Sequence, residues 1–179
     1  MLTITVPESD LWDEQNEVFI SVKEHTLRLE HSLVSISKWE SKWCKSFLNT
    51  ENKTEEETID YIKCMTLTQN VDPNVYKALT AKNLSEINEY IKAPMTATTV
   101  KEKNGGGGRE IVTSELIYYW MITLNIPSEY QKWHINRLLM LIKVCNAKSD
   151  TPKKMSNKEL MSRNAALNAA RRKQLNTKG

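Results

Sequence analysis

The distribution of glycine constrains this chain more than any other feature of its sequence. Four of its five glycines are consecutive, at positions 105–108, and the fifth is the last residue, so residues 1–104 contain none. All-β sandwiches and barrels use glycine in many tight turns, and dinucleotide- and phosphate-binding loops need it where the backbone approaches the ligand. Both classes are therefore disfavoured. The turns must come from helix caps and prolines, and the sequence predicts an α+β fold that is predominantly α-helical.

Charge divides the 179 residues into two parts. Residues 1–147 carry 16 Lys and Arg against 20 Asp and Glu, whereas residues 148–179 carry nine against two. We therefore expect a single compact domain over 1–147 and a basic C-terminal helical tail over 148–179. A hydrophobic content of 40% is sufficient for the domain to form a core.

The first 48 residues predict a small antiparallel β-sheet and the helix that covers it. Apolar and polar residues alternate over 1–6, 18–22 and 27–29, as is typical of half-buried strands. Residues 23–26 are expected to turn a hairpin between the last two strands. From Ser32 or Ser35 as N-cap, apolar residues follow at spacings of three or four as far as Phe47, which indicates a helix packed on the sheet.

Residues 54–147 predict a helical region. Thr54 and Glu57 have the spacing of a capping box at the start of one helix, and Pro73 fits the first position of a short second helix. The apolar spacing over 81–91 indicates a third helix, which Pro94 ends.

The remaining elements are a helix pair, a glycine-rich tip and the tail helix. Residues 113–124 and 128–145 predict an antiparallel pair at the centre of the core, with Ser128 capping the second helix. A flexible tip near 101–110 is expected to join the strands of a ribbon over 95–112. In the tail, a capping box at Ser156 predicts a helix to about residue 173, with a thin apolar stripe.

No segment has the pattern of a catalytic or metal site. The glycine run lacks the Lys-Ser/Thr of a phosphate-binding loop, and neither a nucleophile elbow nor an HExxH segment occurs. The three cysteines are far apart and form no CxxC or short Cys/His pairing. His25 and His31 are interpreted as packing or surface residues. We expect a protein that is not an enzyme and that uses no cofactor or metal.

The apolar segments also bear on the compartment. No basic segment followed by an apolar one opens the chain, so no signal peptide is expected. The longest apolar stretch, residues 116–126, is far shorter than the roughly 20 residues that cross a bilayer. The expectation is a soluble protein of a reducing cytoplasm.

Two features are candidates for binding a partner. Trp39 and Trp43 share one helical face, where they either pack between helix and sheet or form a partner groove. The tail is either a solvated helix, a docking segment for a protein, or a nucleic-acid contact. The absence of tail aromatics and the acidic domain argue against nucleic acid. The candidate partner-binding residues of the tail are Lys153, Lys154, Leu160, Arg163, Leu167, Arg171, Arg172 and Lys173.

Four segments resemble small proteins of long-tailed bacteriophages, the tail assembly chaperones. They are residues 29–40 (LEHSLVSISKWE), 118–121 (YYWM), 131–139 (QKWHINRLL) and 168–173 (NAARRK). The resemblance implies a non-enzymatic protein of the host cell cytoplasm that binds the tape measure protein, keeps it soluble and promotes assembly of the tail tube around it. Such a protein is absent from the mature virion. It implies no residue-level activity, and it leaves a structural tail or neck component as an alternative.

The resemblance and the charge pattern together give a hypothesis about the tail. Residues 153–175 are expected to contact the tape measure protein or a neighbouring copy of the chain, not the chain's own core. The tail tube protein and a homo-oligomer are further possible partners, and a basic nucleic-acid-binding accessory protein is the remaining alternative.

Overall fold

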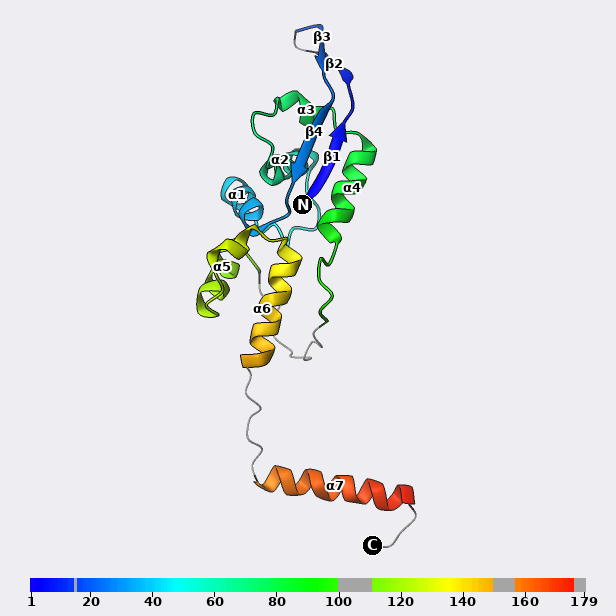
Figure 1. Ribbon diagram of the computed structural model, residues 1–179, viewed down its shortest axis with the longest axis vertical. Coiled ribbons are helices and arrows are strands. Elements are labelled where there is room, and N and C mark those ends of the chain that lie inside the picture. The colour runs from blue at the N-terminus through cyan, green and yellow to red at the C-terminus, as the bar shows by residue number, and fades with distance from the viewer. Residues whose placement is uncertain (15, 100–110, 150–156, 176–179) are drawn as a thin grey trace. The chain divides into compact units, whose positions relative to one another are not determined.

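The computed structural model describes residues 1–14, 16–99, 111–149 and 157–175, and at positions 13, 149, 159 and 160 the backbone alone. The chain divides into two units, Met1–Cys145 and Asn146–Gly179; the charge pattern predicts the boundary between 147 and 148. The first unit has the predicted α+β, predominantly helical architecture (Figure 1). Most of the predicted ribbon and its glycine tip lies outside the described residues.

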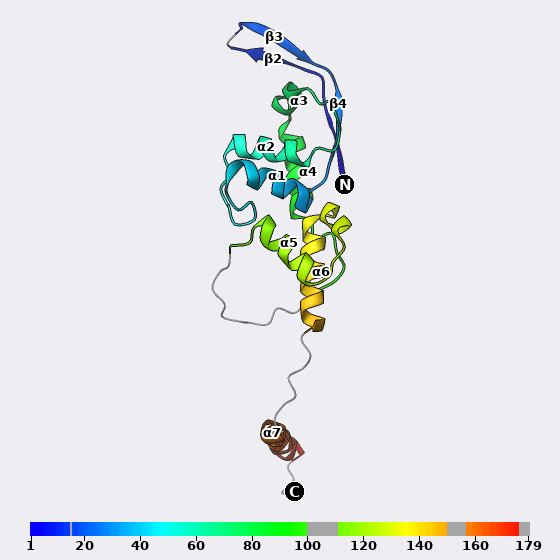
Figure 2. The ribbon, with the colours of Figure 1, turned by 90° about the vertical axis from the view of Figure 1, so that its left-hand side faces the viewer.

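Four short strands form two antiparallel ladders along one long hairpin. β1 (Leu2–Val6) pairs with β4 (His25–Leu29), and β2 (Ser9–Asp13) pairs with β3 (Val18–Val22). The ladders are separate because Pro7, between β1 and β2, has no N–H to donate. The predicted turn at 23–26 is therefore wrong: β3 runs on into β4, and the reversal lies between β2 and β3, as Figure 2 shows.

The β1–β4 ladder forms one wall of the core. Its inward side chains, Ile4, Val6, Leu27 and Leu29, are all buried, in the predicted alternation. Helix α4 (Ala81–Lys92) packs on β1. There the Asn83 amide donates to the Thr5 carbonyl at 3.0 Å.

Helix α1 (Leu33–Trp43) lies at the centre of the core. It contacts α2 (Glu55–Met65), α5 (Ser114–Thr123) and the 3₁₀ helix η1 (Ser128–Lys132). Ser32 caps its start as predicted. It ends before the predicted Phe47, because Cys44 adopts a left-handed φ of 52°. Helix α3 (Pro73–Lys77) has Pro73 at its first position, as predicted, and packs on α2.

The predicted helix over 128–145 is wrong in its first part. Residues 128–132 form η1, which has no side-chain cap, and α6 (Ile135–Ser149) begins only after His134. The reason is a long-range contact: the Ile135 amide donates to the His31 carbonyl at 2.8 Å, and Ser32 and His134 form a β-bridge. Two residues therefore separate η1 from α6: Trp133, whose backbone is extended, and His134, in the bridge. Helix α5 packs on α1, and the inner side chains of both α5 and α6 belong to the buried core; they are Ile117, Met121, Ile135, Leu138 and Ile142.

The second unit contains α7 (Asn157–Leu175), which confirms the predicted tail helix. Its described side chains, at 157–158 and 161–175, are all exposed. The predicted apolar stripe is not found, because the apolar residues are distributed around the helix and do not gather on one face. The predicted capping residue Ser156 lies outside the described residues.

Candidate functional site

The two tryptophans of α1 have different environments. Trp39 has no exposed surface, and its indole N–H donates to the Glu57 carbonyl of α2 at 2.9 Å. Trp43, one turn on, is half-buried, and its indole N–H donates to the Asp60 carboxylate at 2.9 Å. The prediction that Trp39 binds a partner is therefore wrong, because the ring fills the seam between α1 and α2. Trp43 alone keeps exposed surface.

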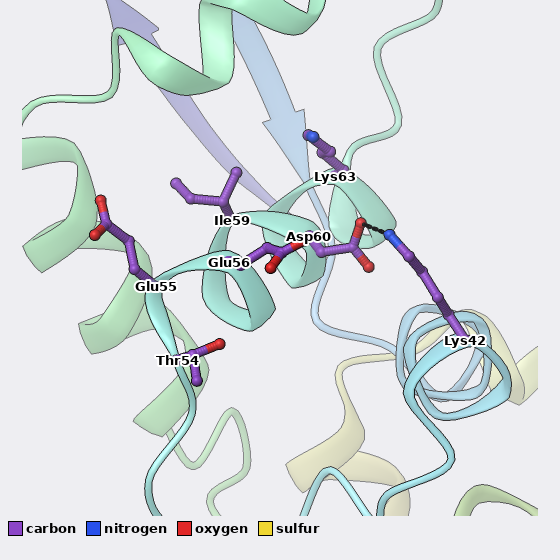
Figure 3. A pocket seen from close by; sticks show the side chains of 7 residues that line it. All are labelled: Lys42, Thr54, Glu55, Glu56, Ile59, Asp60 and Lys63. Carbon is purple, nitrogen blue, oxygen red and sulfur yellow. Dashed lines mark hydrogen bonds and ion pairs between the residues drawn. The ribbon is translucent and has the colours of Figure 1, made fainter.

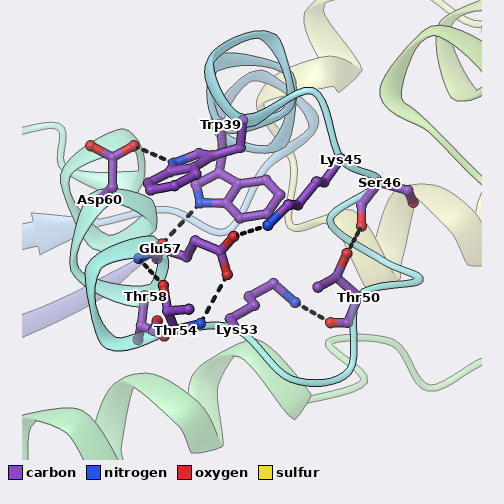
Figure 4. A network of polar contacts seen from close by, with 10 residues as sticks. Trp39, Lys45, Ser46, Thr50, Lys53, Thr54, Glu57, Thr58 and Asp60 are labelled. Carbon is purple, nitrogen blue, oxygen red and sulfur yellow. Dashed lines mark hydrogen bonds and ion pairs between the residues drawn. The ribbon is translucent and has the colours of Figure 1, made fainter.

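A polar network closes this seam from the solvent side (Figure 4). Glu57 forms the predicted capping box with Thr54, and its carboxylate also accepts from Lys45 at 2.6 Å. The hydrogen bond from Lys45 and the one from the Thr54 amide lower the pKa of Glu57. The Lys53 ammonium donates to the Phe47 and Thr50 carbonyls at 2.9 and 2.6 Å. Each of these groups is satisfied within the chain, so the network is structural.

A shallow groove of about 590 Å³ lies beside Trp43, between α1 and α2 (Figure 3). At one side of it, Lys42 of α1 bonds the Asp60 carboxylate at 2.5 Å (Figure 3). Burial alone would raise the pKa of Asp60, but the hydrogen bonds from Lys42 and Trp43 outweigh it and lower that pKa. Ile59 is the one apolar side chain lining the groove, whose other lining residues are Lys42, Thr54, Glu55, Glu56, Asp60 and Lys63. Two lysines and three carboxylates line it, which leaves only a small net charge, so it offers little to an apolar or a strongly charged ligand.

The two histidines at the β4–α6 junction are packing residues. His31 is 1% exposed, its Nδ1 shares a 2.5 Å hydrogen bond with the Tyr61 hydroxyl, and its ring lies 5.0 Å from that of His134. Burial, followed by the nearby His134 and Lys53, lowers the pKa of His31 to about 3. His134 donates through Nε2 to the Tyr90 carbonyl at 3.0 Å. The packing interpretation of His31 is confirmed.

Among the described helices of the first unit, α5 carries the exposed large apolar side chains. Its inner side, Ile117 and Met121, is buried, whereas Tyr119 is 60% and Ile122 76% exposed. The one charged residue in the helix is Glu115. We define the α5 outer face as Leu116, Tyr119, Trp120 and Ile122. Tyr119 lies three residues after Leu116 and three before Ile122, so it joins them on one broad side of the helix; Leu116 and Trp120 are half-buried.

The start of α5 is fixed by a buried carboxylate. Glu40, on α1, is 7% exposed and accepts from the Ser114 amide at 2.7 Å and from the Phe47 amide at 2.8 Å. Thr113 caps the helix. Neither the exposed face nor its anchor is predicted by the sequence, because an apolar segment indicates burial but does not show which side of the helix a neighbouring element covers.

The predicted tail residues are accounted for only in part. Arg171, Arg172 and Lys173 are exposed on α7, and Leu167 is 46% exposed. Arg163 also lies on α7 and is exposed. Lys153 and Lys154 lie outside the described residues, and the side chain of Leu160 is not described.

Comparison of the chain with models of protein families, with curated proteins and with solved structures found no match. Among the described helices, none combines the length and apolar character required to cross a membrane. Within the described part of the chain, no three His, Cys, Asp or Glu residues gather as a metal site.

Proposed function

We propose that this chain is a non-catalytic tail assembly chaperone of a long-tailed bacteriophage, which binds the tape measure protein in the host cytoplasm and is absent from the mature virion. The resemblance of residues 29–40, 118–121, 131–139 and 168–173 supports the class. The observation that carries the binding role is the α5 outer face, which leaves Ile122 76% exposed on a helix with a single charged residue. A helix that is apolar all round is normally buried, so this face needs a cover.

The chemistry of the α5 outer face fits an amphipathic helix. A long helical partner presents apolar residues at i, i+3, i+4 and i+7, and the outer face offers it apolar side chains at 116, 119, 120 and 122. Covering Tyr119 and Ile122 would contribute about 2–4 kcal/mol from apolar area alone. A tape measure protein exposes such helices along its length before the tube encloses them. Binding to this face would therefore compete with aggregation of that protein.

Co-expression tests this role. The tape measure protein of the same phage is expressed with the wild-type chain, with Ile122→Glu, or with the matched control Leu67→Glu, and its soluble fraction is measured. Leu67 is also an exposed apolar residue, at 50%. We expect the wild type and Leu67→Glu to keep the tape measure protein soluble, and Ile122→Glu to reduce its capture by about tenfold or more.

Two results would contradict the proposal in different ways. If the wild-type chain leaves the tape measure protein insoluble and uncaptured, the chaperone role is wrong. If Ile122→Glu captures as well as the wild type, the role of the α5 outer face is wrong. Mass spectrometry of purified phage particles distinguishes the chaperone from the alternative, a structural tail or neck component, since only the latter would be present in them.

A further inference from the structure

The β2–β3 ladder has an exposed aromatic pair. Trp12 and Phe19 lie opposite each other across the strands, with ring centroids 4.9 Å apart, and are 52% and 71% exposed. Asp10 lies two residues before Trp12, so it projects from the same side of the ladder. Among the described residues no third strand pairs with β2 or β3. A two-stranded ribbon is marginally stable by itself, so this face favours a partner.

The segment carrying this pair, residues 8–24, is strongly acidic; we call it the distal hairpin. It contains six Asp and Glu against one lysine. No ion pair among the described residues involves its exposed carboxylates, which are Glu8, Asp10, Glu14, Glu17 and Glu24. The partner it favours is therefore cationic and presents groups that stack on aromatic rings. Arginine has both properties.

The chain itself contains such a partner in its second unit. Residues 148–179 carry nine Lys and Arg against two acids. Helix α7 presents Arg171 and Arg172 side by side in sequence, both exposed, and has no apolar face that would require a core of its own. Helix α7 and the distal hairpin are complementary, because their net charges are opposite and arginines can stack on the uncovered aromatic pair.

We propose that the basic tail of one copy docks on the distal hairpin of a second copy, with arginines of α7 over Trp12 and Phe19 and beside Asp10. A second copy is favoured over the chain's own tail by the arrangement within the first unit. There the hairpin and the last residues of the unit, on α6 up to Cys145, lie at opposite ends in both views (Figures 1 and 2). If each copy docks its tail on the hairpin of the other, the two identical contacts form a dimer with two-fold symmetry. The contact is independent of what the α5 outer face binds.

Charge reversal in the full-length chain, without any tape measure protein, tests the contact. The hairpin variant is Asp10→Lys with Glu17→Lys, and the tail variant is Arg171→Glu with Arg172→Glu. The matched control, Glu89→Lys with Glu129→Lys, reverses two exposed carboxylates elsewhere in the first unit. Sedimentation equilibrium at about 20 mM salt, where surface charges are weakly screened, gives the dissociation constant of each. Circular dichroism checks that each variant is folded.

We expect dimers for the wild type and the control, and a dissociation constant raised at least about tenfold for the hairpin variant and for the tail variant. Mixing the two weakened variants should restore association, because the wild-type tail of one then meets the wild-type hairpin of the other. Trp12→Ala should weaken the dimer without changing its net charge.

Three results would overturn the proposal. A wild-type chain that stays monomeric at about 100 µM lacks the contact. A tail variant that dimerises like the wild type would mean that hairpins pair with each other. A mixture that stays monomeric would mean that tail and hairpin do not contact each other between copies.

Discussion

Replacing Glu40 by alanine should destabilise the first unit at two positions that are far apart in sequence. The Glu40 carboxylate joins the loop after α1 to the first turn of α5, since it accepts from the Phe47 amide at 2.8 Å and the Ser114 amide at 2.7 Å. Both contacts are buried, and Glu40 as a whole is 7% exposed. Alanine removes both acceptors at once and leaves two N–H groups without partners.

The cost follows from those two contacts. A hydrogen bond to a charged group contributes about 1.5–3 kcal/mol, and an unpaired buried donor loses a similar amount. Water entering the vacated space recovers part of this, so we expect a loss of about 3–5 kcal/mol in the free energy of unfolding. For a chain of this size that lowers the midpoint of thermal unfolding by about 6–20 °C.

Urea unfolding followed by tryptophan fluorescence measures the loss, and hydrogen exchange at single amides locates it. The amides of Phe47 and Ser114 should exchange much faster in Glu40→Ala than in the wild type. Glu89→Ala, which truncates an exposed glutamate on α4, is the control and should change stability by less than about 0.5 kcal/mol. The reasoning is refuted if Glu40→Ala is as stable as this control, or if exchange at those two amides is unchanged.

Two further predictions concern the buried rings. The pKa of His31 is about 3 in the folded chain and about 6.5 when unfolded, so as pH falls from 6.5 toward 3 only the unfolded state gains this proton. Stability should fall by up to about 1.4 kcal/mol per pH unit in that window, and His31→Asn should flatten a plot of unfolding free energy against pH. Trp39→Phe should cost about 2–3 kcal/mol in chemical denaturation, because it removes a buried hydrogen bond and leaves a void, whereas Trp43→Phe should cost about 1 kcal/mol. Equal losses for the two tryptophans would contradict the assignment of Trp39 alone to the core.

The helices that were predicted correctly are those whose signals are local. Thr54 and Glu57 contact each other within one turn, and Pro73 fits the first turn of a helix by its own geometry. Such signals depend on neighbours three or four residues away, so the sequence alone is sufficient.

The errors arose where distant contacts decide the structure. β2 was missed because Leu11 and Trp12 are adjacent and project to opposite faces, so the segment has no period-two pattern; its pairing with β3 became visible only in three dimensions. Likewise, the start of α6 depends on the carbonyl of His31, more than 100 residues away.

The candidate site was predicted least well, for a related reason. The spacing of Trp39 and Trp43 places both on one face, but the position of α2 decides which ring is covered. For α5, composition predicted burial, whereas the structure covers Ile117 and leaves Ile122 exposed. Periodicity identifies a helix, and only the packing of the other elements shows which side is free for a partner.

Site-specific photo-crosslinking most directly tests the claim that the α5 outer face binds the tape measure protein. A photoreactive amino acid is placed at position 122, or at position 82 on α4 as an exposed control, and the chain is irradiated while co-expressed with that protein. We predict a covalent adduct with the tape measure protein from position 122 and none from position 82. No adduct from position 122, or equal adducts from both positions, would contradict this account.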